Sequence, residues 1–147
     1  MIQLIRATSL QFKLIRLNLY DKMTNADYRP LMTITSQLTG NSKTFLVATV
    51  NYVNKDRYVE MLVYVQPLSG GENLSAGSLY LGNTDFPLGF YDVTIYQNSS
   101  NSNLDPSGLT TIWNGLMNLT SNSTTDPVTY KEYTTNDSDT ESVYITI

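Results

Sequence analysis

The chain has 147 residues, of which 41% are hydrophobic and only 15% charged, and its formal net charge is −4. It contains neither cysteine nor histidine, which excludes disulfides, thiolate and imidazole metal sites, and the Ser-His-Asp and Cys-His catalytic systems. The acidic balance predicts no nucleic-acid partner, and without an apolar run of about 18 residues we expect no membrane partner.

Alternation of apolar and polar residues predicts a series of short strands. In Arg57–Gln66, for example, Val59, Met61, Val63 and Val65 share one face. The expected strands cover residues 1–6, 12–20, 31–36, 44–53, 57–66, 90–97, 109–119 and 142–147. At the N-terminus Arg6 interrupts the apolar run, so no secretory signal is predicted.

Two early strands carry special expectations. In residues 12–20 the apolar positions change phase, which predicts a bulge or a switch between sheets near Leu14 and Ile15. Residues 44–53 are apolar on both faces near their start, which predicts a strand in the centre of a sheet. The intervening residues 54–57 then form a hairpin connection to the next strand.

Glycines punctuate the second half of the chain. Gly70-Gly71 and Gly82-Asn83 are expected to adopt positive φ, and Pro106 followed by Ser-Gly predicts a turn. In residues 109–119 we expect a bulge at Gly115. Trp113, the only tryptophan, is expected either to anchor the core or to form an interface hot spot.

Together these features predict an all-β fold, an immunoglobulin-like antiparallel β-sandwich of about seven to nine strands, as a single domain over residues 1–147. The sequence LGFYDV resembles a tyrosine corner, in which Gly89 lets the Tyr91 hydroxyl return to upstream backbone. Val93 stands where antibody domains carry a cysteine, so plain apolar packing is expected there.

The charges are unevenly distributed, because residues 1–57 hold eight of the nine basic residues and residues 58–147 hold ten of the thirteen acids. Either the molecule has two electrostatically different ends, or strands from both parts interleave and the asymmetry disappears in space.

Little catalytic chemistry remains possible. The acidic run Asp137, Asp139 and Glu141 alternates like a calcium loop, but it lacks the glycine and the distal glutamate of an EF-hand and fits a solvated turn better. Glu60 and Glu132 form a conceivable carboxylate pair that no spacing marks. We therefore predict no enzyme activity, no catalytic residues, no cofactor and no metal site.

The stretch from Phe86 to Leu119 carries a family resemblance. GFYDVTIYQNSSNSNLDPSG followed by WNGLMNL resembles small virion proteins of tailed phages of Bacteroidetes, including the auxiliary capsid proteins of crAss-like phages. The matching positions are Gly89, Tyr91, Ile95, Tyr96, Asn103, Leu104, Asp105, Pro106 and Gly115.

This resemblance implies a non-enzymatic virion structural protein, made in the cytoplasm of a bacterial host and bound to the capsid surface. Its implied partners are the major capsid protein and other virion proteins, with self-association on the capsid lattice as a further expectation. The polar loop after residue 97 is the expected contact, with the candidate residues Asn98, Asn101, Asn103, Leu104, Asp105 and Pro106. Gly89, Tyr91, Val93, Trp113 and Gly115 are expected to be structural.

Two other functions stay open. The tyrosines and asparagines also suit a fibre, tail or head-fibre attachment module that binds host surface glycan or anchors another virion protein. A carboxylate hydrolase using Glu60, Glu132 or Asp139 is the third hypothesis.

Overall fold

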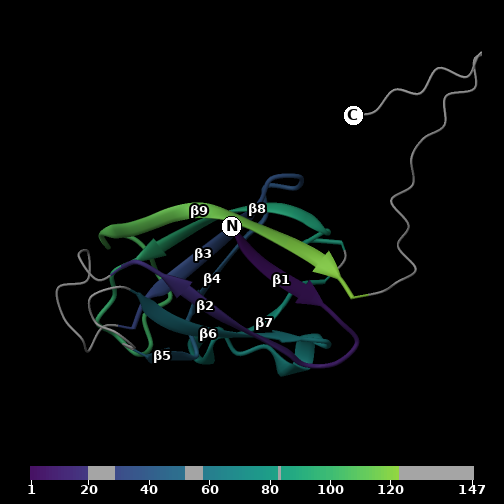
Figure 1. The fold of residues 1–147 in the computed structure, drawn as a ribbon, viewed down its shortest axis with the longest axis horizontal. Helices are drawn as coiled ribbons and strands as arrows, with labels where there is room; N and C mark the ends of the chain where they lie inside the picture. Colours follow the sequence, from purple (N-terminus) through teal and green to yellow (C-terminus); the bar gives the residue numbers. More distant parts are fainter. Residues whose placement is uncertain (20–28, 52–57, 83, 123–147) are drawn as a thin grey trace, which may run out of the picture.

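Alternating apolar residues shape the chain into strands, as the sequence predicts. The structure is a computed structural model that describes residues 1–19, 29–51, 58–82 and 84–122 (Figure 1). The strands are β1 Ile2–Arg6, β2 Gln11–Leu17, β3 Leu31–Ser36, β4 Ser42–Leu46, β5 Thr49–Asn51, β6 Val59–Gln66, β7 Ser78–Tyr80, β8 Gly89–Tyr96 and β9 Thr111–Ser121. Two 3-10 turns, η2 Ser69–Gly71 and η3 Leu74–Ala76, separate β6 from β7. The all-β class is confirmed, and the part of the chain described contains no helix long and apolar enough to span a membrane.

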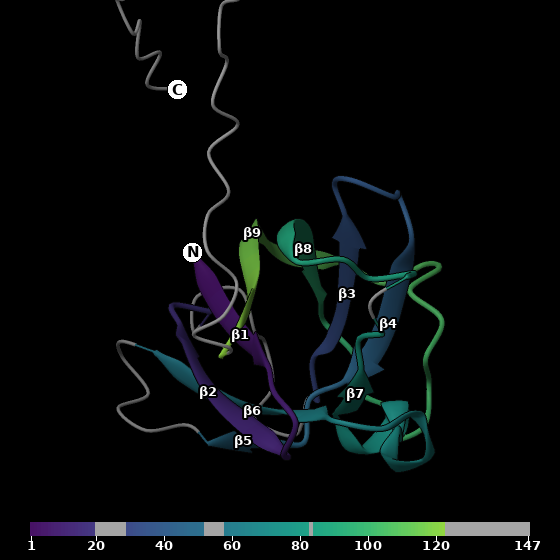
Figure 2. The ribbon, with the colours of Figure 1, turned by 90° about the vertical axis from the view of Figure 1, so that its right-hand side faces the viewer.

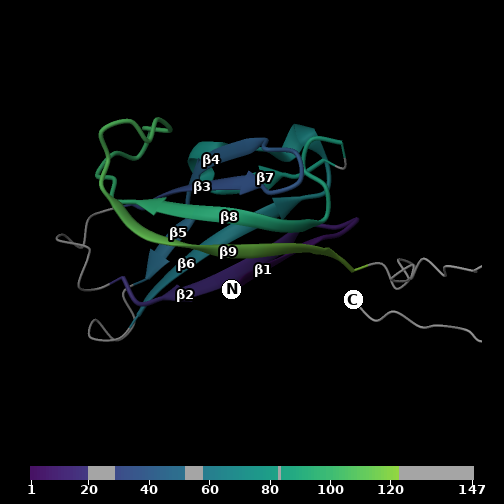
Figure 3. The same ribbon diagram turned by 90° about the horizontal axis from the view of Figure 1, so that it is seen from above.

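The strands form two sheets (Figure 2). The five-stranded sheet has the order β1-β9-β8-β3-β4, and the four-stranded sheet has the order β2-β6-β5, with β7 also paired to β6. Neighbours are antiparallel except for β1 with β9 and β6 with β7, which are parallel. Seen from above, the strands of the four-stranded sheet cross beneath those of the five-stranded sheet (Figure 3).

One apolar core lies between the two sheets. The inward face of β6 contributes Val59, Met61, Val63 and Val65, which are at most 3% exposed. The opposite sheet contributes the inward residues of its own strands, namely Ile2, Leu4, Met32, Ile34, Phe45, Tyr91, Val93, Ile95, Met117 and Leu119. The alternation in residues 57–66 therefore marks the buried face of β6 correctly. That residues 1–147 form a single domain stays a prediction, because this range includes residues outside the described ones.

The expectation of one central strand over residues 44–53 is wrong. The chain leaves the five-stranded sheet after Leu46 and joins the four-stranded sheet at Thr49, so β4 and β5 are edge strands of different sheets. Gly77 packs against this crossing so closely that a Cβ would lie 2.3 Å from the Ala48 amide nitrogen. The apolar run in the sequence reflects a crossing between two layers rather than burial on both faces of one sheet.

The predicted bulge near Leu14 and Ile15 is also wrong. β2 pairs with β6 in an unbroken register from Gln11 opposite Val65 to Leu17 opposite Val59. Ile15 is buried, whereas Phe12 is 72% exposed and Leu14 is 39% exposed. The change of phase in the sequence thus arises because two apolar side chains of β2 point outward.

β9 does contain an irregularity, but not at Gly115. Ile95 lies opposite Trp113 and Tyr96 lies opposite Thr111, which leaves Ile112 as the extra residue. Gly115 pairs regularly with Val93. Ile112 is 3% exposed, so the bulge turns an additional apolar side chain into the core.

The turn predictions have mixed outcomes. The turn expected after Pro106 is present, because the Leu109 amide donates to the Pro106 carbonyl, and Gly108 adopts φ +76° within it. Gly70, Gly71 and Gly82 are not among the glycines with positive φ, which contradicts the prediction, and Gly70 and Gly71 instead belong to η2. Asn83, the hairpin at 54–57 and the strand at 142–147 lie outside the described residues.

Strands from the basic part of the sequence, residues 1–57, and from the acidic part, residues 58–147, lie side by side in both sheets. β1, β3 and β4 from the basic part lie in one sheet with β8 and β9, and β2 lies beside β6. Among the described strands, interleaving therefore distributes the two charge blocks over both sheets.

Candidate interaction surface

The loop of residues 97–110, which follows β8, is built from short side-chain to backbone hydrogen bonds. Ser100 Oγ accepts from the Asn103 amide at 3.1 Å, and Asn103 Oδ1 accepts from the Asp105 amide at 2.9 Å. Asp105 Oδ1 in turn accepts from the Ser107 amide at 2.9 Å. These are Asx and Ser turns in succession, and they give a defined shape to a stretch of chain whose one charged residue is Asp105.

Asn98 is not a surface contact, which corrects the prediction for this residue. It is 2% exposed, and its Nδ2 donates to the carbonyls of Arg29, at 3.2 Å, and Ser100, at 2.8 Å. The Arg29 amide donates back to the Asn98 carbonyl at 2.9 Å. Asn98 therefore fastens the start of the loop to the segment that leads into β3, and a partner cannot reach its side chain.

The other predicted contact residues lie nearer the surface. Asn101 and Asp105 are exposed, while Asn103, Leu104 and Pro106 are half-buried. The hydrogen bond from the Ser107 amide lowers the pKa of Asp105 below its ordinary value, because it stabilises the carboxylate. The tip of the loop thus presents one fixed carboxylate among neutral polar groups.

The loop adjoins the outer face of the five-stranded sheet, which is nearly free of charge. We define this outer face as the side chains of its strands that point away from the core. It consists of Gln3, Ile5, Leu31, Thr33, Thr35, Ser42, Thr44, Leu46, Phe90, Asp92, Thr94, Tyr96, Asn114, Leu116, Asn118 and Thr120. Asp92 is its one ionisable acid, and no lysine or arginine belongs to this set.

Apolar side chains are exposed on this outer face. Phe90 is 52% exposed, Leu116 is 44% exposed and Ile5 is 41% exposed. Phe90 lies opposite Asn118 and Asp92 lies opposite Leu116, so Phe90 and Leu116 are diagonal neighbours on adjacent strands. Phe90 and Leu116 are not among the predicted contact residues, although the alternation in GFYDVTIY already separates Phe90 and Asp92 from the buried Tyr91 and Val93.

At the opposite edge of the outer face, Leu31 and Leu46 are paired across β3 and β4 and are 0% exposed. They lie outside the main core cluster. Figures 2 and 3 show that the 97–110 loop extends from the end of β8 toward this β4 side of the sheet. The loop therefore lies toward the β4 edge of the five-stranded sheet.

The predicted structural residues hold the strands that carry this surface. Gly89 adopts φ +132° where β8 begins, and the Tyr91 hydroxyl donates to the Pro87 carbonyl at 2.5 Å. The hydrogen bond expected of a tyrosine corner is thus present. Burial raises the pKa of Tyr91, and a hydrogen bond with Ser36 and the charge of Arg6 oppose this shift. Val93 is 1% exposed and packs in the core.

Trp113 packs at the margin of the core and is partly buried. A Cβ at Gly115 would lie 2.1 Å from the indole Cη2 atom, so the ring occupies the space beside this glycine. The position of Trp113 on the inward side of β9 fits the expectation of a core anchor better than that of an interface hot spot.

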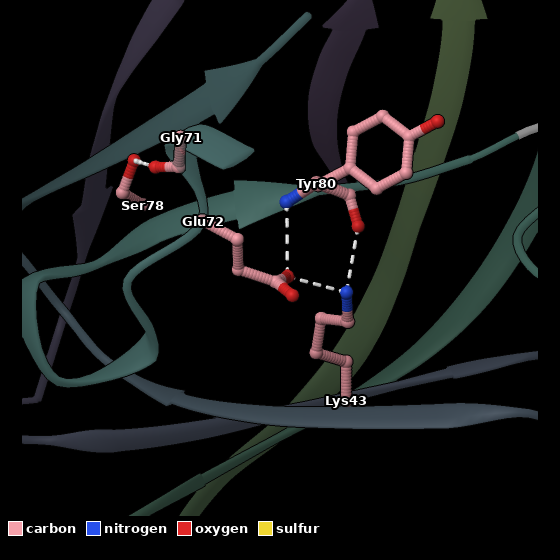
Figure 4. A network of polar contacts seen from close by, with 5 residues as sticks. All are labelled: Lys43, Gly71, Glu72, Ser78 and Tyr80. Carbon is pink, nitrogen blue, oxygen red and sulfur yellow. Dashed lines mark hydrogen bonds and ion pairs between the residues drawn. The ribbon is translucent and has the colours of Figure 1, made fainter. Parts of the chain in front are cut away.

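A polar network joins β4 of the five-stranded sheet to β7 of the four-stranded sheet (Figure 4). Lys43, on β4, forms an ion pair with Glu72 and donates to the Tyr80 carbonyl at 2.6 Å, while the Tyr80 amide donates to Glu72 Oε1 at 3.0 Å. Lys43 Nζ also lies 4.9 Å from the centre of the Phe86 ring. Lys43 Nζ and Glu72 Oε1 each have two polar partners in this network, which indicates a structural contact between the sheets rather than a reactive site.

The carboxylates considered for catalysis or metal binding are not brought together in the described residues. Glu60 is 8% exposed and pairs with Arg16 at 3.5 Å, and the described residues contain no cluster of three metal-ligating side chains. Glu132, Asp137, Asp139 and Glu141 lie outside the described residues. Two hollows between β1 and β2, of about 180 and 110 Å³, are each smaller than the roughly 300–1,000 Å³ of small-molecule sites.

Comparison with known proteins adds no relative to this description. The sequence matches no family model, and no curated protein or solved structure is significantly similar to the chain.

Proposed function

We propose that the protein is a non-enzymatic structural protein of a phage virion, an auxiliary subunit on the outside of the capsid that binds the major capsid protein. The observation that supports this proposal most directly is the outer face of the five-stranded sheet. It is broad and almost uncharged, it exposes Phe90 and Leu116, and it adjoins a loop with a fixed conformation.

A surface of this kind suits another protein better than a small ligand. Protein interfaces are enriched in aromatic side chains at their centres and depleted in charged ones. The outer face has this composition, with Phe90 and Tyr96 on β8 beside neutral threonines and asparagines. The 97–110 loop adds a polar rim whose backbone is already ordered, so less conformational entropy is lost on binding.

The immunoglobulin-like form of the sandwich is part of the same proposal. When the short strand β7 is left out and the others are lettered in chain order, β9-β8-β3-β4 corresponds to the G-F-C-C′ order of a variable-type domain and β2-β6-β5 corresponds to B-E-D. The hydrogen bond from Tyr91 to Pro87, at the start of β8, is an independent feature that supports this interpretation.

Two experiments test the capsid role. Mass spectrometry of purified phage particles should detect the protein in the virion, and its restriction to the infected-cell lysate would contradict the proposal. Recombinant protein should also bind to particles that lack it. Phe90→Ser combined with Leu116→Ser should weaken this binding at least tenfold, because both side chains lie on the outer face.

Phe12→Ser is the matched control for the binding experiment. Phe12 is also exposed, but it lies on β2 in the other sheet, so its substitution should leave particle binding unchanged. Equal loss of binding by both variants would show that the outer face of the five-stranded sheet is not the contact.

An attachment module that holds host glycan is the second candidate function. Tyr96, Asn114 and Asn118 share the outer face, and such side chains can stack on and hydrogen-bond to sugars. Specific binding on a glycan array that is lost in Asn114→Ala would favour this candidate. Absence of binding across the array would leave the capsid role as the better proposal.

A further inference from the structure

Asp92 lies near the centre of the outer face of the five-stranded sheet. β8 is the middle strand of that sheet, and Asp92 is the fourth of its eight residues. Leu116 lies opposite Asp92 on β9, and Thr35 lies opposite it on β3. Because Phe90 precedes Asp92 by two residues on the same face, a partner that covers Phe90 and Leu116 also covers the Asp92 carboxylate.

The Asp92 carboxylate is held in position but keeps its charge. Asp92 is exposed, and Gln37 Nε2 donates to its Oδ1 atom at 2.8 Å. The Gln37 amide also donates to the Phe90 carbonyl at 3.0 Å, which holds the glutamine beside β8. A neutral donor orients a carboxylate without cancelling its charge, and a carboxylate can accept further hydrogen bonds at its second oxygen.

Acidic side chains without an ion pair follow β8 along the chain. The acids among the described residues are Glu60, Glu72, Asp85, Asp92 and Asp105. The first two form ion pairs with basic side chains. Asp85 lies in the turn before β8, Asp92 lies within β8, and Asp105 lies in the loop after it. All three are exposed, and none forms an ion pair with a described residue.

The lysine and arginine side chains of the described residues lie away from the outer face. They are Arg6, Lys13, Arg16, Arg29 and Lys43. Lys13 and Lys43 point inward, since Lys13 lines the hollows between β1 and β2 and Lys43 belongs to the network of Figure 4. Arg16 lies in the other sheet, and Arg6 and Arg29 donate to backbone carbonyls. The described part of the chain therefore offers Asp92 no counter-charge.

A partner that covers Asp92 has to supply that counter-charge. Covering a carboxylate with apolar groups alone is unfavourable, because the carboxylate loses its contact with water and gains no compensating interaction. A lysine or arginine replaces the water with a charge-assisted hydrogen bond.

We propose that the outer face binds a protein surface in which a lysine or arginine pairs with Asp92 and apolar side chains cover Phe90 and Leu116. This proposal rests on the function proposed above, in which the outer face is the contact with the capsid. Asp85 and Asp105 add attraction at longer range, which favours faster association with a basic surface.

Binding of recombinant protein to particles that lack it, compared at about 0.05 M and about 0.5 M NaCl, tests the charge of the partner. Binding of the unsubstituted protein should weaken at least about threefold at the higher salt concentration, because ions screen the attraction. At the lower concentration Asp92→Asn should weaken binding at least about threefold, and Asp92→Lys at least about tenfold. Asparagine keeps an oxygen that can accept from Gln37, so its effect reports the charge rather than this hydrogen bond.

Phe12→Lys is the matched control for charge. It changes the net charge by the same one unit as Asp92→Asn, but on β2 in the other sheet, where Phe12 is 72% exposed. Its particle binding should equal that of the unsubstituted protein at both salt concentrations. The loss caused by Asp92→Asn should be smaller at the higher concentration, where charges are screened.

Two results would overturn the basic partner but leave the capsid contact in place. In one, Phe90→Ser with Leu116→Ser weakens binding, while Asp92→Asn binds as tightly as the unsubstituted protein or more tightly. In the other, binding does not depend on salt, as expected if the group that is bound is a neutral glycan. If neither set of variants weakens binding, the outer face is not the contact, and both proposals fail.

Discussion

The indole ring of Trp113 lies against Gly115, two residues along the same strand, and leaves no room for a side chain there. A Cβ at position 115 would be 2.1 Å from Cη2 and 2.4 Å from Cζ2 of the ring. Gly115→Ala should therefore push the indole out of its place at the margin of the core and destabilise the fold by about 1–3 kcal/mol.

Chemical denaturation monitored by tryptophan fluorescence can check this prediction, because Trp113 is the only tryptophan. Gly70→Ala is the control, since a Cβ at Gly70 meets no atom within 4 Å and its φ is not positive. A stable Gly115→Ala protein with unchanged emission would show that the ring does not depend on this glycine.

The hydroxyl of Tyr91 holds the turn before β8 through its bond to the Pro87 carbonyl. Tyr91→Phe removes the donor and leaves a part-buried carbonyl without its partner, so we expect a loss of about 1–3 kcal/mol in the free energy of unfolding. Tyr96→Phe, on the outer face of the same strand, should cost less. Urea denaturation of both variants measures the difference, and equal losses would contradict the role assigned to the Tyr91 hydroxyl.

Asn98 is predicted to matter for folding rather than for binding. Asn98→Ala would leave the carbonyls of Arg29 and Ser100 without this donor and should cost about 1–3 kcal/mol of stability. The exposed Asn101, three residues further along the loop, should tolerate alanine with a change of less than about 0.5 kcal/mol. Thermal unfolding of the two variants compares them, and a destabilised Asn101→Ala protein with a stable Asn98→Ala protein would reverse the assignment.

The stability of the turn at Asp105 should decrease at low pH. The bond from Ser107 lowers the pKa of Asp105, so the carboxylate stabilises the turn above the ordinary pKa of about 3.9. That contribution should be lost as the pH falls through the lowered value in the folded protein. The amide chemical shift of Ser107 should report this titration, and Asp105→Asn should make the shift independent of pH in this range. Titration of Ser107 in the Asn variant would assign it to another group.

The sequence predicts the interior of this fold better than its connections. β3, β6 and β8 were located closely because buried apolar residues recur at every second position in each of them, as expected of a strand with one face in the core. The three-residue strand β7 was missed because Ser78–Tyr80 is too short to establish a pattern.

Several of the failures share a physical cause, because the burial of a side chain depends on what covers it from outside its own strand. Leu46 points away from the main core but is buried, whereas Phe12 points away from it and is exposed. Both are apolar residues of edge strands, so local sequence cannot distinguish them. Asn98 is similar, because its burial depends on Arg29, far away in the chain.

The parallel pairing of β1 with β9 has a mechanical consequence. The two strands are aligned from Ile2 opposite Met117 to Arg6 opposite Ser121, with the N-terminus at one end and the continuing chain at the other. Tension applied between residue 1 and the chain after Ser121 would slide the strands past each other. Their hydrogen bonds would then bear the load together instead of opening one after another, so this pair should resist stretching more strongly than a hairpin pulled open from its end.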